Sequence, residues 1–115
     1  MMFTGTLNPV SNKATWVCLY ELIDAETDEA IDLSDVDEIT ISIRDPKDQT
    51  IELSATYTNG DITITDTGIF RWVFSNDNMS NLEPKTYEVG CTLEQDGEVM
   101  QLIIGNLPVM DGIVS

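Results

Sequence analysis

The stretch that decides the fold runs from Leu82 to Leu93 and reads LEPKTYEVGCTL. It begins as a turn, because Pro84 fixes its own φ angle and ends any helix that precedes it. From Tyr87 onward, apolar residues alternate with polar or small ones, so one face of the segment is apolar. This period of two is that of a half-buried β-strand. The stretch therefore predicts a tight turn that leads into a central strand of a β-protein.

The turn and its tyrosine resemble the corner of immunoglobulin-like and fibronectin-like sandwiches. In such a corner, a tyrosine hydroxyl ties the strand to the turn before it. In this chain Pro84 stands one residue closer to Tyr87 than in the fibronectin pattern. The resemblance implies that Tyr87 and Pro84 are structural residues that hold the corner together.

Length and charge limit the possible functions. The chain has 115 residues, the size of one domain, and its hydrophobic share of 42% is enough for a core without metals or cross-links. Its 21 acidic and 5 basic residues give a net charge of −16. This charge repels phosphate backbones and anionic lipids, so we expect no nucleic-acid partner and no membrane partner. The sequence shows no basic leader and no apolar run of about 20 residues, which predicts a protein made in the cytoplasm.

The two cysteines, Cys18 and Cys91, could form one bridge at most. In the cytoplasm we expect them to be reduced and buried. In immunoglobulin domains a tryptophan lies between the paired cysteines near the first one, whereas here Trp16 precedes Cys18 and Trp72 comes far after it. The pattern therefore favours free thiols over a disulfide.

Short strand-like segments fill most of the chain, and turn residues separate them. The expected strands are residues 15–23, 38–44, 51–57, 62–64, 69–74, 87–93 and 99–109. The first is nearly continuous in apolar residues, which predicts burial on both faces. In the last, Gly105 is expected to mark a bulge. Asn59-Gly60 and Asp96-Gly97 are typical of two-residue hairpins, and residues 75–82 suit a single helical turn.

Regular short spacing without a helical period predicts an all-β fold. We expect a single antiparallel β-sandwich of about seven strands, immunoglobulin-like or fibronectin-like. Residues 15–115 form this domain, and residues 1–14, which have no periodicity, form a mobile N-terminal arm or one ordered against a neighbour.

The chain lacks the residue sets that most catalysis needs. It has no histidine, no Gly-rich phosphate loop and no spaced Cys or His set for zinc, so we expect no enzyme and no cofactor. Five acidic residues fall at positions 1, 3, 5, 9 and 12 of a calcium loop: Asp24, Glu26, Asp28, Asp32 and Asp35. Glu29 replaces the glycine of position 6, and Asp35 is shorter than the glutamate of position 12. A solvated acidic turn is therefore favoured over a metal site.

The aromatic row Phe70, Trp72 and Phe74 fits either a core or a sugar-stacking platform, and a core is favoured. With the aromatics inward, the opposite face of that strand carries apolar residues and a cation on an acidic surface. Together with the first and last strands, it leaves more apolar surface than a small sandwich buries, which is typical of a protein–protein contact. The candidate interface residues are Val17, Leu19, Ile69, Arg71, Val73, Val99 and Ile103.

Four phrases of the chain are similar to those of a known family. Ala30–Ser34 (AIDLS) is like pvDLTG, and Ile41–Asp48 (ISIRDPKD) is like x-V-R-D-P-x-G. Met79 to Leu93 is like M-x-x-L-x-P-G-x-Y-x-x-x-L, with Lys85 in place of the glycine and the last leucine two positions later, at Leu93. Residues 105–114 are like G-x-V-x-V-x-x-G-V. From Trp16 onward the layout resembles small β-sandwich structural proteins of tailed bacteriophage virions, including the N-terminal module of phage baseplate upper proteins.

This resemblance implies a virion structural component of the tail, baseplate, neck or fibre attachment, with a capsid decoration protein as the alternative. Its partners would be other virion proteins and copies of itself. A carbohydrate- or calcium-binding adhesion module is the alternative of another class, and a small hydrolase is a third. The resemblance carries over no catalytic residue.

Overall fold

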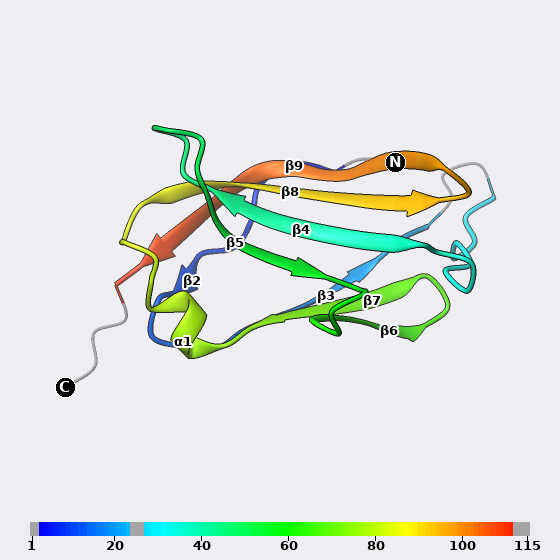
Figure 1. Cartoon of the computed structure of the whole chain (residues 1–115), viewed down its shortest axis with the longest axis horizontal. Coiled ribbons are helices and arrows are strands. Elements are labelled where there is room, and N and C mark those ends of the chain that lie inside the picture. The colour runs from blue at the N-terminus through cyan, green and yellow to red at the C-terminus, as the bar shows by residue number, and fades with distance from the viewer. Residues whose placement is uncertain (1–2, 24–26, 112–115) are drawn as a thin grey trace.

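The computed structural model describes residues 3–23 and 27–111, which form two β-sheets packed face to face (Figure 1). The larger sheet has the order β1-β9-β8-β4-β5, with β2 also on β9, and the smaller has the order β3-β7-β6. The elements are β1 Phe3–Thr6, β2 Val10–Ser11, β3 Trp16–Glu21, β4 Glu38–Arg44, β5 Ile51–Thr56, β6 Ile62–Asp66, β7 Ile69–Phe74, α1 Asn76–Met79, β8 Thr86–Gln95 and β9 Glu98–Met110. The predicted all-β sandwich is confirmed.

The core lies between the sheets, where alternate residues of each strand point inward. Ile39, Ile41 and Ile43 of β4 are fully buried. From β7, the row Phe70, Trp72 and Phe74 fills the opposite side of the core. The Trp72 ring meets that of Trp16 edge-on, with centroids 5.6 Å apart. Because the aromatic row is buried, it is a core element and offers no platform to a sugar.

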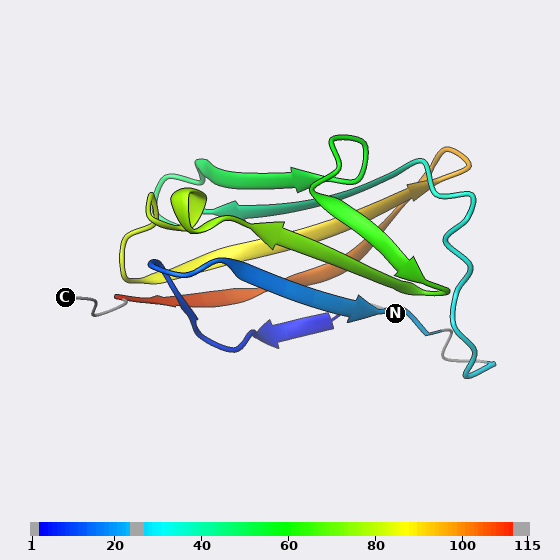
Figure 2. The same ribbon diagram turned by 90° about the horizontal axis from the view of Figure 1, so that it is seen from below.

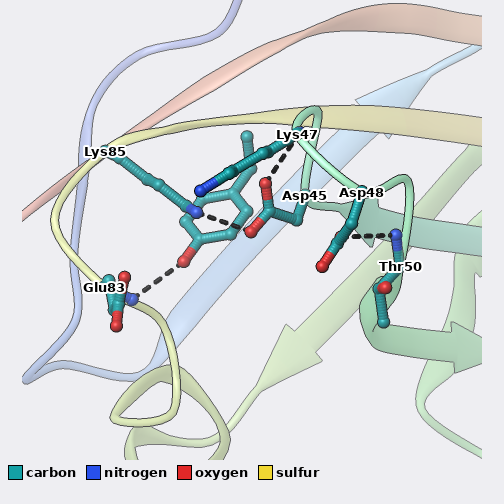
Figure 3. A network of polar contacts seen from close by, with 7 residues as sticks. Asp45, Lys47, Asp48, Thr50, Glu83 and Lys85 are labelled. Carbon is teal, nitrogen blue, oxygen red and sulfur yellow. Dashed lines mark hydrogen bonds and ion pairs between the residues drawn. The ribbon is translucent and has the colours of Figure 1, made fainter.

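The corner that the sequence predicts is present at the start of β8. Tyr87 is buried, and its hydroxyl oxygen accepts a hydrogen bond from the backbone N–H of Glu83 at 2.8 Å (Figure 3). Burial raises the pKa of Tyr87 and outweighs the Glu83 N–H, which lowers the pKa because it also stabilises the phenolate oxygen. The bond fixes the loop that crosses from α1, beside the smaller sheet, to β8 in the larger one.

Within residues 3–12, β1 and β2 pair with β9 of the same chain, which corrects for these residues the expectation of a mobile arm or one ordered against a neighbour. β1 runs parallel to β9 with Thr6 opposite Asn106, and β2 continues with Val10 opposite Val109. The side chain of Asn12 is buried and donates to the carbonyl of Leu82 at 3.1 Å. The physical reason is that the backbone groups along this border of β9 need partners, and the segment supplies them.

Strand β3 is not buried on both faces, in contrast to the expectation for residues 15–23. It is an edge strand of the smaller sheet, and within residues 3–23 and 27–111 no strand or helix covers its outer side. Val17 and Leu19 are accordingly 51% and 62% exposed, while Trp16, Cys18 and Tyr20 point inward and are half-buried. A continuous apolar run therefore reflects an apolar outer surface here, and not a second covering layer.

The two expected hairpins differ in outcome. Asp96 and Gly97 join the antiparallel neighbours β8 and β9, and both have positive φ, 54° and 80°. Asn59-Gly60 instead lies between β5 and β6, which belong to different sheets. It is a turn that carries the chain across the sandwich, so the hairpin prediction is wrong at this point.

The bulge of β9 lies at Leu102 and not at Gly105. Cys91 pairs with Ile103 and the next residue of β8 pairs with Gln101, which leaves Leu102 as the extra residue. As a result, Leu102 and Ile103 are both buried, at 1% exposure each. Gly105 has another role: a Cβ atom there would lie 2.4 Å from the carbonyl oxygen of Gly5 in β1.

Candidate interaction surfaces

The outer face of the smaller sheet brings together five of the predicted interface residues. Val17 pairs with Val73, Leu19 with Arg71, and Glu21 with Ile69 across β3 and β7. Val17, Leu19 and Arg71 are exposed, whereas Ile69 and Val73 are half-buried. We call Val17, Leu19, Ile69, Arg71 and Val73 the β3–β7 patch. Since cross-strand neighbours lie within contact distance, these side chains form one continuous surface.

A single cation lies within this patch. Among the described residues, the ion pairs are Arg44–Glu88 and Lys85–Asp45, so Arg71 belongs to neither. Arg71 is one of only 5 basic residues in a chain of net charge −16. An apolar surface around a guanidinium favours a partner that covers the apolar side chains and places a carboxylate at the cation.

The other two predicted interface residues lie elsewhere. Val99 is 66% exposed but belongs to β9 in the larger sheet, next to the β8–β9 hairpin. Ile103 is buried, so its prediction as an interface residue is wrong. The bulge at Leu102 shifts the alternation and turns Ile104 outward, with 52% of its surface exposed. The sequence holds no signal for this shift, because bulges depend on the pairing of two strands.

The outer face of the larger sheet carries a shallow hollow of about 460 Å³. Three glycines, Gly5, Gly90 and Gly105, border it because they place no side chain over the sheet. An ion pair stands beside it, with Arg44 Nη2 2.9 Å from Glu88 Oε1. The hollow thus combines missing side chains with a charge pair that is already satisfied within the chain.

Gln101, which lines the hollow together with the polar Ser42 and Asn106, is engaged within the chain. The Gln101 amide nitrogen donates to the carbonyl oxygens of Cys91, at 3.2 Å, and Ile103, at 2.7 Å. These bonds bridge the β9 bulge, because Gln101 lies on one side of Leu102 and the Cys91–Ile103 pair lies on the other. Neither a nucleophile with a base nor a pair of free carboxylates lines this hollow, so its residues offer no acid–base chemistry.

The acidic loop has no metal-site geometry in its described part. Asp24 and Glu26 lie outside the described residues. Asp28, Asp32 and Asp35 are exposed, and no group of three or more His, Cys, Asp or Glu gathers within residues 3–23 and 27–111. Asp32 instead accepts a hydrogen bond from the Ser34 N–H at 2.9 Å, which lowers the pKa of its carboxyl.

Both cysteines are free thiols. Burial raises the pKa of Cys91 to about 12, and burial also raises the pKa of the half-buried Cys18. At neutral pH both thiols are protonated, which makes them poor nucleophiles. Cys91 is therefore a small apolar core residue.

A polar network fastens one end of the larger sheet (Figure 3). Lys85 Nζ lies 2.5 Å from Asp45 Oδ2 and 5.3 Å from the centre of the Tyr87 ring. This contact joins the turn after β4 to the start of β8, and the same turn is closed by the Lys47 N–H donating to Asp45 Oδ1 at 2.9 Å. The hydrogen bond between the Lys85 ammonium and the Asp45 carboxylate lowers the pKa of Asp45 and raises the pKa of Lys85. Pro84, just before Lys85, is exposed.

No protein-family model matches the sequence, and the search of curated proteins gives no match. None of the helices in the described part of the chain has the length and apolar character needed to cross a membrane.

Proposed function

We propose that the chain is a structural component of a tailed-phage virion: a β-sandwich present in many copies that binds its neighbours in the tail, baseplate, neck or fibre attachment. The observation that carries the proposal is the β3–β7 patch, where Val17 and Leu19 stand in solvent beside Arg71. Exposed apolar surface rimmed by polar residues is typical of a protein contact. The resemblance of the Ile41–Asp48 and Met79–Leu93 phrases to phage sandwich proteins supports the virion as the setting.

The proposed mechanism is adhesion without catalysis, cofactor or nucleic acid. The patch packs against another virion protein or another copy of this chain, and a carboxylate of the partner pairs with Arg71. A net charge of −16 keeps the other faces soluble and apart, so that contacts concentrate where negative charge is sparse, as in the patch, which only Glu21 of β3 borders along the β3–β7 pairs. Strand pairing and side-chain packing then give a symmetric body.

Capsid decoration is the second candidate within this class, since the same patch would bind a head lattice equally well. An adhesion module that binds carbohydrate or calcium is the candidate of another class. Burial of Trp72 removes the aromatic platform that the carbohydrate version would use. The described acidic residues supply no calcium cluster in support of the calcium version.

A reconstruction of the intact particle whose genome encodes this chain tests the proposal. We expect several copies of the sandwich, with the β3–β7 patch covered by a neighbour. Purified particles that lack the chain by mass spectrometry would refute the virion role. Particles that contain it with the patch facing solvent would refute the proposed contact.

Leu19→Lys sharpens the test at the level of one side chain. A buried ammonium at the patch centre should weaken incorporation into particles by about tenfold or more, since each 1.4 kcal/mol of binding is a factor of about ten. Monomer stability should change by less than about 0.5 kcal/mol, because Leu19 is 62% exposed. Ile51→Lys, also exposed but on β5 in the other sheet, is the matched control and should incorporate normally.

A further inference from the structure

The N-terminal segment binds the body through one border of β9. We define the arm as residues 3–12, which run along one border of the sandwich in dark blue (Figure 2). Its backbone bonds reach β9: the Leu7 N–H donates to the Asn106 carbonyl at 2.8 Å, and the Asn12 N–H donates to the Met110 carbonyl at 3.1 Å. The arm therefore consists of two short strands, β1 and β2, which pair with residues 103–110 of β9. We call this border of β9 the acceptor edge.

Both halves of this contact are free of charge. Residues 1–12 contain no Asp, Glu, Lys or Arg, and neither do residues 101–110 of β9, in a chain of net charge −16. Two copies of the chain repel each other over most of their surfaces. An arm and an acceptor edge from different copies would meet without bringing like charges together at the contact.

The acceptor edge is shaped for this arm in particular. Gly5 has a φ of 135°, a conformation that side chains rarely adopt, and its carbonyl oxygen passes where a Cβ of residue 105 would be. Glycine at both positions makes this approach possible, and they lie opposite each other in the register. A second copy carries the same glycine in the same register, so it fits the edge as well as the chain's own arm does.

A short exposed connection joins the arm to the rest of the sandwich. Residues 13–15 are all exposed, and they carry the chain from β2 in the larger sheet to β3 in the smaller one. If this connection opens, the arm leaves without disturbing the strands of the smaller sheet.

We propose that the arm is exchanged between copies: in the assembly, residues 3–12 of one copy occupy the β9 edge of a neighbouring copy. This proposal deepens the assembly role and rests on it for the setting. The chain's own arm competes at an effective concentration of roughly 1 mM, typical of a short tether, so exchange requires neighbours held at comparable concentration. A particle built of many copies provides that condition.

Cysteine pairing across the arm contact tests the proposal on the full-length chain. Thr6 and Asn106 are both exposed and directly opposite in the parallel ladder, and neighbouring strands lie about 4.8 Å apart, within disulfide range. Thr6→Cys and Asn106→Cys are placed on separate chains, each with Cys18→Ser. The buried Cys91, with its pKa of about 12, is kept in both. The two chains are unfolded, refolded together at about 1 mM to match the tether, and oxidised.

Exchange predicts a disulfide-linked heterodimer in excess over both homodimers. Random collision would give heterodimers as at most about half of all dimers, because the two chains are statistically equivalent in that case. Deleting Lys13 and Ala14 from both chains shortens the connection and should raise the heterodimer yield several-fold. If this shortened chain fails to fold, the mixture with the natural connection decides.

The double variant on one chain, Thr6→Cys with Asn106→Cys, reports whether the bond can close at all. If it closes within single chains while no mixture gives more than the random share of heterodimer, the exchange is refuted. Leu19→Lys behaviour is independent of this result, so failure of the exchange and failure of the proposed patch contact are distinguishable.

Gly105→Ala provides the specificity control. The added Cβ would meet the Gly5 carbonyl oxygen at 2.4 Å, so the arm should be expelled and the heterodimer lost when the substitution is made in the Asn106→Cys chain. Gly90→Ala is its match in the same sheet, since a Cβ there meets its nearest neighbour, Gln101 Nε2, at an ordinary 3.6 Å. Equal heterodimer yields from the two alanine variants would contradict docking at the Gly5–Gly105 contact.

Discussion

The two outer faces of the sandwich differ in chemistry although their strands alternate in the same way. The outer face of the larger sheet carries the polar Ser42 and Thr92 and the Arg44–Glu88 ion pair. Beside the hollow it also carries Ile51 and Ile104, which are 58% and 52% exposed. The outer face of the smaller sheet carries Val17 and Leu19, both more than half exposed. The core does not require either set of outward-facing side chains, because both outer faces lie outside the core. Both faces therefore expose apolar side chains. The smaller sheet differs in that Arg71, a cation outside both ion pairs, lies among them, which supports the β3–β7 patch as the proposed contact surface.

The largest difference in free energy of unfolding is expected between substitution of a core residue and substitution of a residue on an outer face. Ile41 of β4 is fully buried, so Ile41→Ala should lower the free energy of unfolding by about 2–5 kcal/mol. Leu19→Ala, on the outer face of β3, should change it by less than about 0.5 kcal/mol. Urea denaturation of both variants measures the contrast. A cost above about 2 kcal/mol for Leu19→Ala would mean that the patch stabilises the isolated chain.

The second-largest loss of stability is expected from the corner, where the Tyr87 hydroxyl accepts from the Glu83 N–H. Tyr87→Phe removes the acceptor of the Glu83 N–H and should cost about 1–3 kcal/mol, since a partly buried donor loses its partner. Tyr57→Phe is the control, because Tyr57 is 37% exposed and should tolerate the loss of its hydroxyl. Equal stabilities of the two variants in thermal denaturation would show that the corner bond contributes nothing.

The Asp45–Lys85 contact at the sheet end should show as a pH dependence. Its hydrogen bond lowers the pKa of Asp45 from the ordinary 3.8, so the contribution to stability is present above pH 3.8 and fades as the pH falls through the lowered pKa. The pKa of Lys85 is raised from 10.5, so on the alkaline side the contribution is lost as the pH rises through that raised value.

Asp45→Asn isolates this contribution from the general effect of acid on a chain of net charge −16. We expect the wild-type advantage in melting temperature to be present at neutral pH and to vanish in strong acid. Asp61→Asn removes the same charge from a carboxylate outside both ion pairs and serves as the reference. A difference between wild type and Asp45→Asn that persists at the acid end would exclude ionisation of Asp45 as its cause.

The smallest effect is expected on the polar outer face. Arg44 and Glu88 are 43% and 38% exposed at their side chains, and pairs of this kind contribute little. Glu88→Gln should cost no more than about 0.5 kcal/mol. A double-mutant cycle with Arg44→Met measures the coupling, and a value well above 1 kcal/mol would mean that the pair holds the sheet together.

The sequence predicted the bounds of a strand best where one face of the strand is buried and the other is not. The expected bounds 38–44 and 69–74 are those of β4 and β7, because clean alternation reports a strand with one buried face. The outward direction of Ile69, Arg71 and Val73 follows from the same alternation. The exposure of Val17 and Leu19 does not, because the continuous apolar run of the first strand predicted burial on both faces. Ile103 was not, because the extra residue at Leu102 arises from the register with β8.

The turns also show that local sequence does not determine which strands pair. Asn59-Gly60 and Asp96-Gly97 carry the same local preference for positive φ, and yet the second closes a hairpin while the first carries the chain between sheets. Local backbone preference fixes where the chain turns. It does not fix which strand comes to lie alongside, because that depends on which apolar faces must be covered.

The sequence by itself determined an all-β sandwich, an aromatic core row, a tyrosine corner and an acidic chain with an apolar outer patch. These follow from side-chain period, turn chemistry and charge, which are local properties. Tertiary structure alone decided the pairing of residues 3–12 with β9, the edge position of β3 and the burial of Ile103. Each of these depends on contacts between residues that are distant in the chain. Such contacts decide which backbone groups form hydrogen bonds with each other and which apolar faces are buried.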